Sequence, residues 1–322
     1  MSNMALKTVD LMDAPPPPQA SDYLIYPWLQ PGRLTLMVGA TEAGKTTLTV
    51  EMLAACAKGE RLFNRYPTKK IHSVLYLHAE HSIYTVQEIA QKRGDIPHDL
   101  VTVIHEFGGY GSAMIQDQRP NIALLREIGE IADKIKPSLI IAEPISAFLA
   151  SSENDNKEAR MLIQILTSLG AKYHAAVLTH HHFGKSAFDP EHHRPAGIPT
   201  GEARGAMAFE DAAERVLYLK RDSSHVKIET PKPKGYPVSP VHLKRDEDTL
   251  KYTLFSDAPS PDVVGLCSFI RSSSPAHKSV LTKQFATSWK CPEAYISQLF
   301  KRAENLGLVS PDGRLTEVDS HV

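Results

Sequence analysis

Short apolar runs alternate with longer amphipathic stretches between Tyr23 and about residue 256. The short runs predict strands that are buried on both faces, and several of the stretches between them have helical periodicity. The predicted strands are 33–38, 73–77, 100–104, 138–142 and 175–178. The predicted helices between them are 46–58, 86–93, 122–135 and 157–169. This alternation predicts an α/β fold with a largely parallel sheet.

The pattern changes after Arg215, where shorter segments alternate polar and apolar residues. These segments are 216–219, 226–229, 241–243 and 252–255, and turns rich in Pro, Gly and charged residues separate them. Alternation of this kind is typical of antiparallel strands at the edge of a sheet. We therefore expect residues 23–256 to form one domain with a parallel core and antiparallel edge strands.

The two ends of the chain differ from this domain. Residues 1–22 contain four consecutive prolines and predict a disordered tail, although a docking peptide remains an alternative. Residues 257–261 predict a linker, and residues 262–322 predict a small module with helices at 262–271, 281–288 and 292–306 and a hairpin around Asp312-Gly313. The last helix is predicted by an apolar stripe formed by Ile296, Leu299, Phe300, Ala303 and Leu306.

Composition narrows the class of protein. The chain has 322 residues, of which 42% are hydrophobic, so it can bury a substantial core. Its net charge of −1 argues against a protein held to nucleic acid by bulk charge. Cys56, Cys267 and Cys291 are too widely spaced for a disulfide framework and predict reduced thiols in a cytoplasmic protein. No apolar run approaches the roughly 20 residues that span a bilayer, so we expect no membrane partner.

The most specific motif is a glycine-bounded loop between the first predicted strand and the first predicted helix. It fits the pattern G-x-x-x-x-G-K-[ST], whose backbone amides surround phosphate oxygens. Lys45 is expected to reach the β- and γ-phosphates of ATP, and the Thr46 hydroxyl to bind Mg²⁺. The expected cofactor-binding residues are Gly39, Ala40, Thr41, Glu42, Ala43, Gly44, Lys45, Thr46 and Thr47.

Two acidic residues follow predicted strands. Glu80 comes after 73–77, and Glu143 comes directly after 138–142. The carboxyl ends of parallel strands line the crevice of such sheets, where nucleotide hydrolysis needs acidic groups for Mg²⁺ and for the attacking water. The alternative for each is a solvated or capping carboxylate.

With these motifs together, residues 23–256 resemble the RecA-fold ATPases and, among them, the plasmid RepA-type hexameric helicases. The resemblance rests on the phosphate loop, on Ala79-Glu80-His81, on the segment 143–148 and on Leu178-Thr179-His180-His181. It implies that Glu80 is the catalytic glutamate, that Glu143 holds Mg²⁺ through water, and that His180 senses the γ-phosphate.

The chain departs from this family at Glu143, where the family normally has Asp. A glutamate is longer by one methylene and would displace the cation or require another water arrangement. We therefore expect either slow hydrolysis or a site that accommodates the extra carbon.

The resemblance also implies a cation that acts on the neighbouring subunit's nucleotide. Arg204 corresponds to the arginine of RepA-type proteins, and Lys232 and Lys234 resemble the paired basic residues of RecA-like rings. Surface charge is the alternative for all three residues. Arg204 is the stronger candidate, and the partners implied are further copies of the same chain in a hexameric ring.

Two segments are candidates for DNA contact. In similar proteins the region of residues 183–200 faces single-stranded DNA, and here it carries Lys185 and Arg194. Its histidines, with His180–His182, fit no specific zinc spacing. The C-terminal module resembles a winged helix-turn-helix, although such modules also bind proteins. Its expected duplex-facing residues are Tyr295, Gln298, Lys301 and Arg302.

These observations predict an ATP-hydrolysing, RecA-like DNA motor of the replicative-helicase type. The alternative is a nucleotide-gated DNA-binding regulator or adaptor with little motor activity. A small-molecule kinase is disfavoured because no second basic lid for an acceptor is visible.

Overall fold

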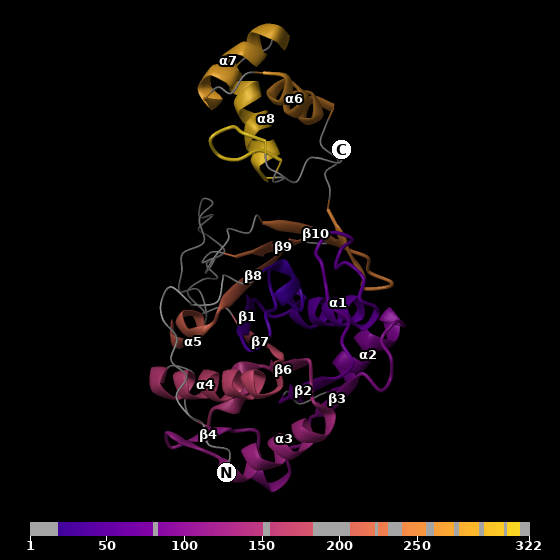
Figure 1. Ribbon diagram of the computed structural model, residues 1–322, viewed down its shortest axis with the longest axis vertical. Helices are drawn as coiled ribbons and strands as arrows, with labels where there is room; N and C mark the ends of the chain where they lie inside the picture. Colours follow the sequence, from indigo (N-terminus) through magenta and orange to yellow (C-terminus); the bar gives the residue numbers. More distant parts are fainter. Residues whose placement is uncertain are drawn as a thin grey trace.

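A nine-stranded sheet organises the described part of the chain (Figure 1). The computed structural model describes residues 19–79, 83–150, 155–182, 207–222, 225–230, 240–255, 261–273, 277–289, 293–305 and 308–315. The strand order is β11-β10-β9-β8-β1-β7-β6-β2-β3. The strands are β1 Leu34–Gly39, β2 Val74–His78, β3 Val101–Ile104, β6 Leu139–Glu143, β7 Ala176–His182, β8 Arg215–Asp222, β9 His225–Glu229, β10 Val241–Arg245 and β11 Tyr252–Leu254.

The sheet is parallel from β3 to β8 and antiparallel from β8 to β11. This confirms the predicted α/β architecture with antiparallel edge strands. One detail of the prediction is wrong: β8 was grouped with the antiparallel strands, but it pairs with β1 in parallel, Val38 opposite Tyr218. Its other edge pairs antiparallel with β9, so β8 is the strand at which the direction changes.

Helices cover both faces of the sheet. Helices α1 Lys45–Lys58 and α2 Tyr84–Arg93 cover one face, and α3 Ile122–Ile135, α4 Asn156–Tyr173 and α5 Met207–Ala212 cover the other (Figure 1). Each face has its own buried cluster because successive strand residues point to opposite sides. Met37, Tyr76 and Ile141 face α1, whereas Leu36, Leu75 and Ile140 face α3 and α4.

Several small elements lie outside the predicted set. A two-stranded ribbon pairs β4 Ile115–Gln116 with β5 Arg119–Pro120. Short 3-10 helices lie at Ala20–Asp22, Gly108–Tyr110 and Ile145–Phe148. Strand β7 is also longer than predicted, because its polar residues continue to pair with β1 as far as Gly39 opposite His182. The phosphate loop and the end of β7 therefore lie side by side at the carboxyl ends of the parallel strands.

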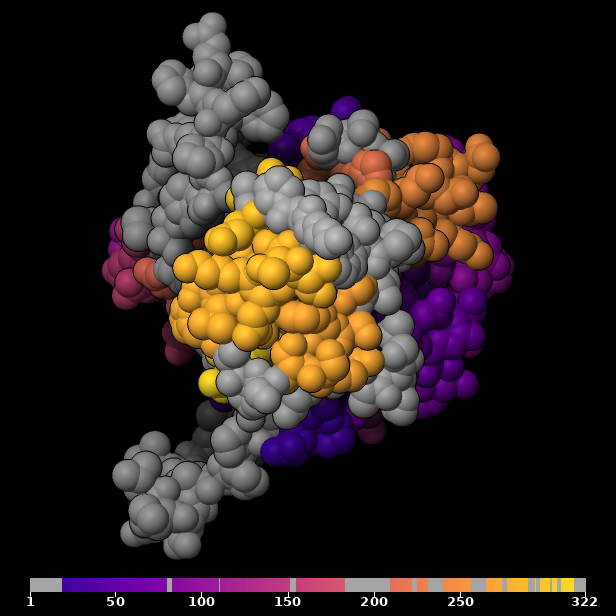
Figure 2. Space-filling view, turned by 90° about the horizontal axis from the view of Figure 1, so that it is seen from above, coloured from indigo at the N-terminus to yellow at the C-terminus, as the bar shows by residue number. Residues whose placement is uncertain are grey.

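The C-terminal residues form three helices with a separate core. These are α6 Pro261–Ser272, α7 Lys278–Trp289 and α8 Glu293–Asn305, close to the predicted ranges. Leu266, Phe285 and Phe300 are among their buried residues, and a bridge joins Val309 to Leu315 after α8. Viewed from above, the atoms of the C-terminal helices gather into one rounded mass, coloured orange to yellow (Figure 2). The winged-helix assignment remains a prediction.

Within the described ranges, no helix combines the length and the apolar character that crossing a bilayer requires.

Candidate functional site

The glycine-bounded loop joins the carboxyl end of β1 to the amino end of α1. Gly44 precedes the helix with φ of 93°, a left-handed conformation that a side chain disfavours. A Cβ atom there would also lie 2.5 Å from the hydroxyl of Tyr252. The loop therefore requires glycine at residue 44 for two separate reasons, and its curvature leads directly into the positive end of the α1 dipole.

Lys45 lies across this loop. Its ammonium donates hydrogen bonds of 2.9 Å to the carbonyl oxygens of Gly39 and Ala40, and the residue is 8% exposed. A buried ammonium held by two carbonyls is positioned for an anion within the curve of the loop. The structure thus holds the Lys45 ammonium against the carbonyls at the start of the loop.

Thr46 and Glu143 meet across the site. The Thr46 hydroxyl donates a 2.6 Å hydrogen bond to Oε1 of Glu143, which stands at the last position of β6 and is 3% exposed. The other oxygen, Oε2, accepts a hydrogen bond from the phenol of Tyr76 on β2. Both oxygens of a buried carboxylate are therefore occupied by hydroxyl donors.

His180 lies beside the same carboxylate. Its Nδ1 is 2.9 Å from Glu143 Oε2, and its Nε2 is 2.8 Å from the hydroxyl of Thr49 on α1. The distance is short, but the contact does not meet hydrogen-bond geometry; a proton on Nδ1 suits it, because a carboxylate only accepts. The next residue, His181, points to the opposite face, where its ring packs 5.1 Å from that of Phe209. The two histidines therefore cannot share a metal ion.

The pKa of Glu143 reflects this environment. Burial by itself raises the pKa of a carboxyl group, because it penalises the charged form. The adjacent His180 and the hydrogen bonds to Glu143 outweigh burial and lower its pKa to about 2. Glu143 is consequently an anion at neutral pH, with oxygen atoms of the kind that Mg²⁺ prefers close to the Thr46 hydroxyl.

The antiparallel strands support the loop from the side. Tyr252 of β11 places its hydroxyl 3.4 Å from the Gly44 carbonyl, and its backbone amide donates a 3.0 Å hydrogen bond to Glu51 of α1. Glu51 also pairs with Arg93 of α2 at 3.1 Å, and both side chains are largely buried. From β8, Arg221 donates to the Glu42 carbonyl at 3.2 Å. The loop is therefore held by two strands, β11 and β8, while the contacts of Glu51 hold α1 against β11 and α2.

Not every predicted site residue can be placed. Gln298 and Lys301 are exposed on α8, and Tyr295 and Arg302 belong to the same helix without described side chains. The remaining predicted residues lie outside the described residues: Glu80, Lys185, Arg194, Arg204, Lys232 and Lys234. Their roles remain predictions.

Three residues of this site, Tyr76, Thr49 and Glu51, were not predicted from the sequence. Tyr76 stands in an apolar run and Thr49 inside an apolar helix, where each resembles core. The contact of Tyr76 depends on which strand lies beside β2. Tyr76 stands opposite Ile141 of β6, two residues before Glu143, and residues that share a face of neighbouring strands approach each other.

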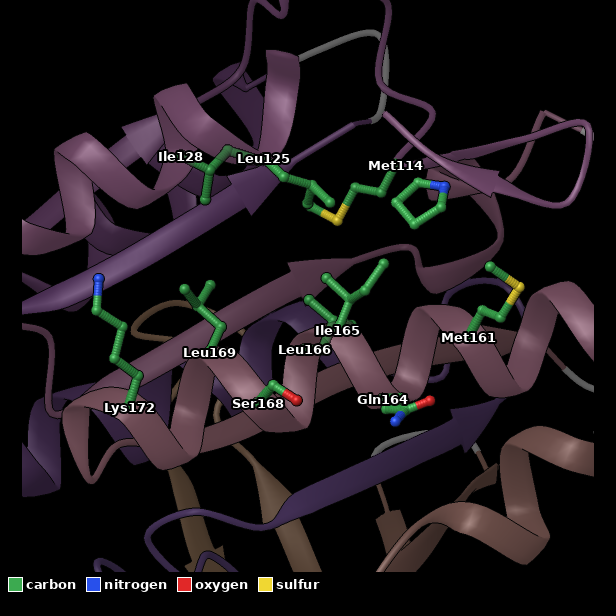
Figure 3. Close-up of a pocket in the computed structure, with 11 residues that line it drawn as sticks. Met114, Leu125, Ile128, Met161, Gln164, Ile165, Leu166, Ser168, Leu169 and Lys172 are labelled. Carbon is green, nitrogen blue, oxygen red and sulfur yellow. The ribbon is translucent and has the colours of Figure 1, made fainter. Parts of the chain in front are cut away.

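A second concave region lies elsewhere in the fold. A cavity of about 460 Å³ separates α3 from α4, where Leu125 and Ile128 face Ile165 and Leu169 (Figure 3). At one end, Lys172 is tied to Asp133 by a 2.7 Å ion pair. No residue of the phosphate loop lines this cavity, and its lining is mainly apolar, so we do not assign it to phosphate chemistry.

The fold and the loop define an α/β P-loop protein. A family comparison is more specific: the chain belongs to the AAA domain family, whose model matches residues 2–187. No curated protein sequence matches the chain.

Solved structures place the fold among RecA-like ATPase cores. One of them, a solved ATPase domain, superposes with a TM-score of 0.52 at 12% identity, covering 70% of this chain and 85% of that one. A DnaB-like replicative helicase, described with its interactions with primase, gives a TM-score of 0.51 at 13% identity. That match covers 69% of this chain and 58% of the helicase chain. At these identities the likeness establishes the fold alone.

Proposed function

We propose that this protein is an ATPase that acts as a ring-shaped DNA motor of the replicative-helicase type. The observation that carries the proposal is the contact between the Thr46 hydroxyl and the buried anion Glu143, directly beside the Lys45 loop. A P-loop, a cation-binding hydroxyl and a strand-end carboxylate are the parts that phosphoryl transfer from ATP requires. The likeness to a solved ATPase domain and to a DnaB-like replicative helicase supports the finer assignment.

The residues present fit a magnesium–nucleotide complex. The Thr46 and Glu143 oxygens are hard donors, and Glu143 is charged. When bound, Mg²⁺ neutralises charge on the phosphates. In this proposal the loop amides and Lys45 hold the β- and γ-phosphates, Thr46 contributes its oxygen to the cation, and Glu143 orients that oxygen or a cation-bound water.

We assign the hydrolysis step to residues that follow the strands of this site in the sequence. Glu80 follows β2 by two residues, and β2 neighbours β6, so we assign the orientation of the attacking water to Glu80. We assign Arg204 of a neighbouring copy to the developing phosphate charge. His180 contacts Glu143 and Thr49, so we expect it to sense the γ-phosphate through Glu143.

DNA contact is proposed for residues 183–200, with Lys185 and Arg194 on phosphates. This segment follows β7, which neighbours β1 and ends beside the phosphate loop. Hydrolysis at the loop is therefore close to the start of the DNA-binding segment. For the C-terminal helices we propose a winged-helix role in which Tyr295, Gln298, Lys301 and Arg302 contact duplex DNA.

The test is ATP turnover with and without single-stranded DNA, together with strand displacement and particle imaging in a non-hydrolysable analogue. The proposal predicts stimulated turnover, displacement of a strand and closed rings. The Arg204→Ala variant should lose hydrolysis while it retains nucleotide binding. Binding to duplex DNA at unchanged turnover, without displacement, would support the alternative regulator function instead.

A further inference from the structure

Tyr76 is a fully buried side chain whose one polar atom meets the site carboxylate. The phenol ring lies in the apolar cluster between the sheet and α1, and its hydroxyl donates to Glu143 Oε2. Tyr76, Ile141 and Glu143 point to the same face of neighbouring strands β2 and β6. The tyrosine is thus placed by the sheet itself, one strand away from the carboxylate.

A buried carboxylate anion requires such donors. Taking a charge out of water is costly unless hydrogen bonds and nearby charges compensate. Glu143 is 3% exposed, and its compensation consists of the Thr46 hydroxyl on Oε1 and of Tyr76 and His180 on Oε2. Thr46 belongs to the phosphate loop, whereas Tyr76 and His180 belong to strands. The carboxylate therefore links the loop to the rigid sheet.

The length of the glutamate matters to this link. An aspartate would draw the carboxylate back by about 1.5 Å, the length of one carbon–carbon bond. It would then lose the contact with Thr46 or the contacts with Tyr76 and His180, because these partners approach opposite oxygens. The arrangement around Glu143 accounts for a glutamate at this strand end.

We propose that Tyr76 is a positioning residue. Together with His180, it fixes the carboxylate of Glu143 in the orientation in which Glu143 accepts the hydrogen bond from the Thr46 hydroxyl. The lone pairs of the Thr46 oxygen are then left for the cation of the magnesium–nucleotide complex. Thr49 completes the arrangement, since its hydroxyl holds the far nitrogen of the His180 ring. This inference rests on the proposed nucleotide function of the same site.

The test measures the affinity of a fluorescent N-methylanthraniloyl ADP, once with Mg²⁺ and once with EDTA. Tyr76→Phe deletes only the hydroxyl. It should weaken binding about tenfold in Mg²⁺, which corresponds to about 1.4 kcal/mol, and leave binding in EDTA unchanged. Tyr218→Phe is the matched control, because Tyr218 is equally buried in the same sheet but faces the other cluster. It should leave both affinities unchanged.

A double-mutant cycle separates positioning from general destabilisation. In a Glu143→Ala background, Tyr76→Phe should cause no further loss of Mg²⁺-dependent affinity, because its effect passes through Glu143. If Tyr76→Phe does not fold, Thr49→Val tests the His180 part of the arrangement, because it removes the hydroxyl that holds the His180 ring, and it should weaken the Mg²⁺-dependent affinity as well.

Equal weakening in Mg²⁺ and EDTA, or no weakening in either, overturns this inference and leaves the proposed function standing. Additive losses in the double mutant overturn it as well. A wild-type protein whose nucleotide affinity does not respond to Mg²⁺ overturns the proposed function itself, and the role of Tyr76 with it.

Discussion

Single side chains determine what the phosphate loop can hold. Lys45 provides the positive charge inside the loop, Thr46 provides a hydroxyl, and Glu143 provides a negative charge at the end of β6, two strands away from β1. None of the three is freely solvated, so their positions depend on hydrogen bonds that single substitutions remove. Two predictions belong to this scale.

Lys45→Ala should abolish most ATP turnover. The substitution removes the cation that would contact the β- and γ-phosphates, and losses of about 100-fold or more are usual for groups that stabilise transferring phosphates. Steady-state hydrolysis measures the effect. The control is Lys58→Ala at the other end of α1, whose ammonium pairs with Asp95; it should retain wild-type turnover. Similar turnover in both variants would refute the role of Lys45.

Tyr252 should make stability depend on alkaline pH. Burial raises the pKa of Tyr252 from 10.0 to about 12. The neutral phenol therefore stabilises the fold fully below pH 10, and this contribution is lost as the pH rises towards 12. By pH 11 the loss should reach about 1.4 kcal/mol relative to Tyr252→Phe.

Urea unfolding at pH 9 and pH 11 measures this difference. Tyr84→Phe, which alters a residue that is 75% exposed, should lose stability in parallel with the wild type. Parallel losses in Tyr252→Phe and the wild type would show that the phenol does not titrate as stated.

At the scale of elements, the junction between β1 and α1 depends on Gly44. Gly44→Ala would place a methyl group at positive φ and 2.5 Å from the Tyr252 hydroxyl, so nucleotide binding should be lost. The control is Gly94→Ala at the end of α2. Its φ of 70° is also positive, but the nearest neighbouring atom lies 3.7 Å away. It should cost about 1 kcal/mol of stability and leave nucleotide binding intact. Equal binding by both variants would contradict the close approach of β11.

Two glycines inside helices should respond in opposite directions to alanine. Around Gly129 in α3 nothing lies within 4 Å of a new Cβ, so Gly129→Ala should raise stability by about 0.5–1 kcal/mol. Around Gly170 in α4 a Cβ would lie 2.6 Å from Val177 of β7, so Gly170→Ala should lower stability. Chemical denaturation of both variants measures the change in the free energy of unfolding. A change of the same sign in both would contradict the packing of α4 on the sheet.

The strands show how much of the fold could be predicted from the sequence. Strands β1, β2 and β6 were found within about one residue because buried parallel strands are continuous apolar runs. The end of β7 was missed because His180–His182 are polar, and their pairing with β1 depends on tertiary structure. The direction of β8 was wrong because a strand with one parallel and one antiparallel neighbour has no separate signature in its residues.

For the site, the loop and Glu143 were predictable from spacing and from their position after strands. The contacts of Tyr76, Thr49 and Glu51 were not, because each residue resembles core or helix surface in the sequence, and its partner is distant along the chain. A polar atom inside an apolar run becomes informative only when the neighbouring strand is known.

At the scale of the whole molecule, the sheet brings the residues of the proposed nucleotide site together at the carboxyl ends of its parallel strands. Strands β1, β7 and β6 are neighbours, and their carboxyl ends carry the phosphate loop, His180 and Glu143. The sheet changes direction beyond β8, and its antiparallel strands carry Tyr252 back to the loop. The three C-terminal helices have a buried core of their own.

The measurement that tests the central claim most directly is calorimetric titration of the full chain with ATP in the presence of Mg²⁺. The arrangement of Lys45, Thr46 and Glu143 predicts uptake of one nucleotide per chain, with an affinity that falls when EDTA replaces Mg²⁺. No uptake of ATP at millimolar concentration in the presence of Mg²⁺ would contradict the account.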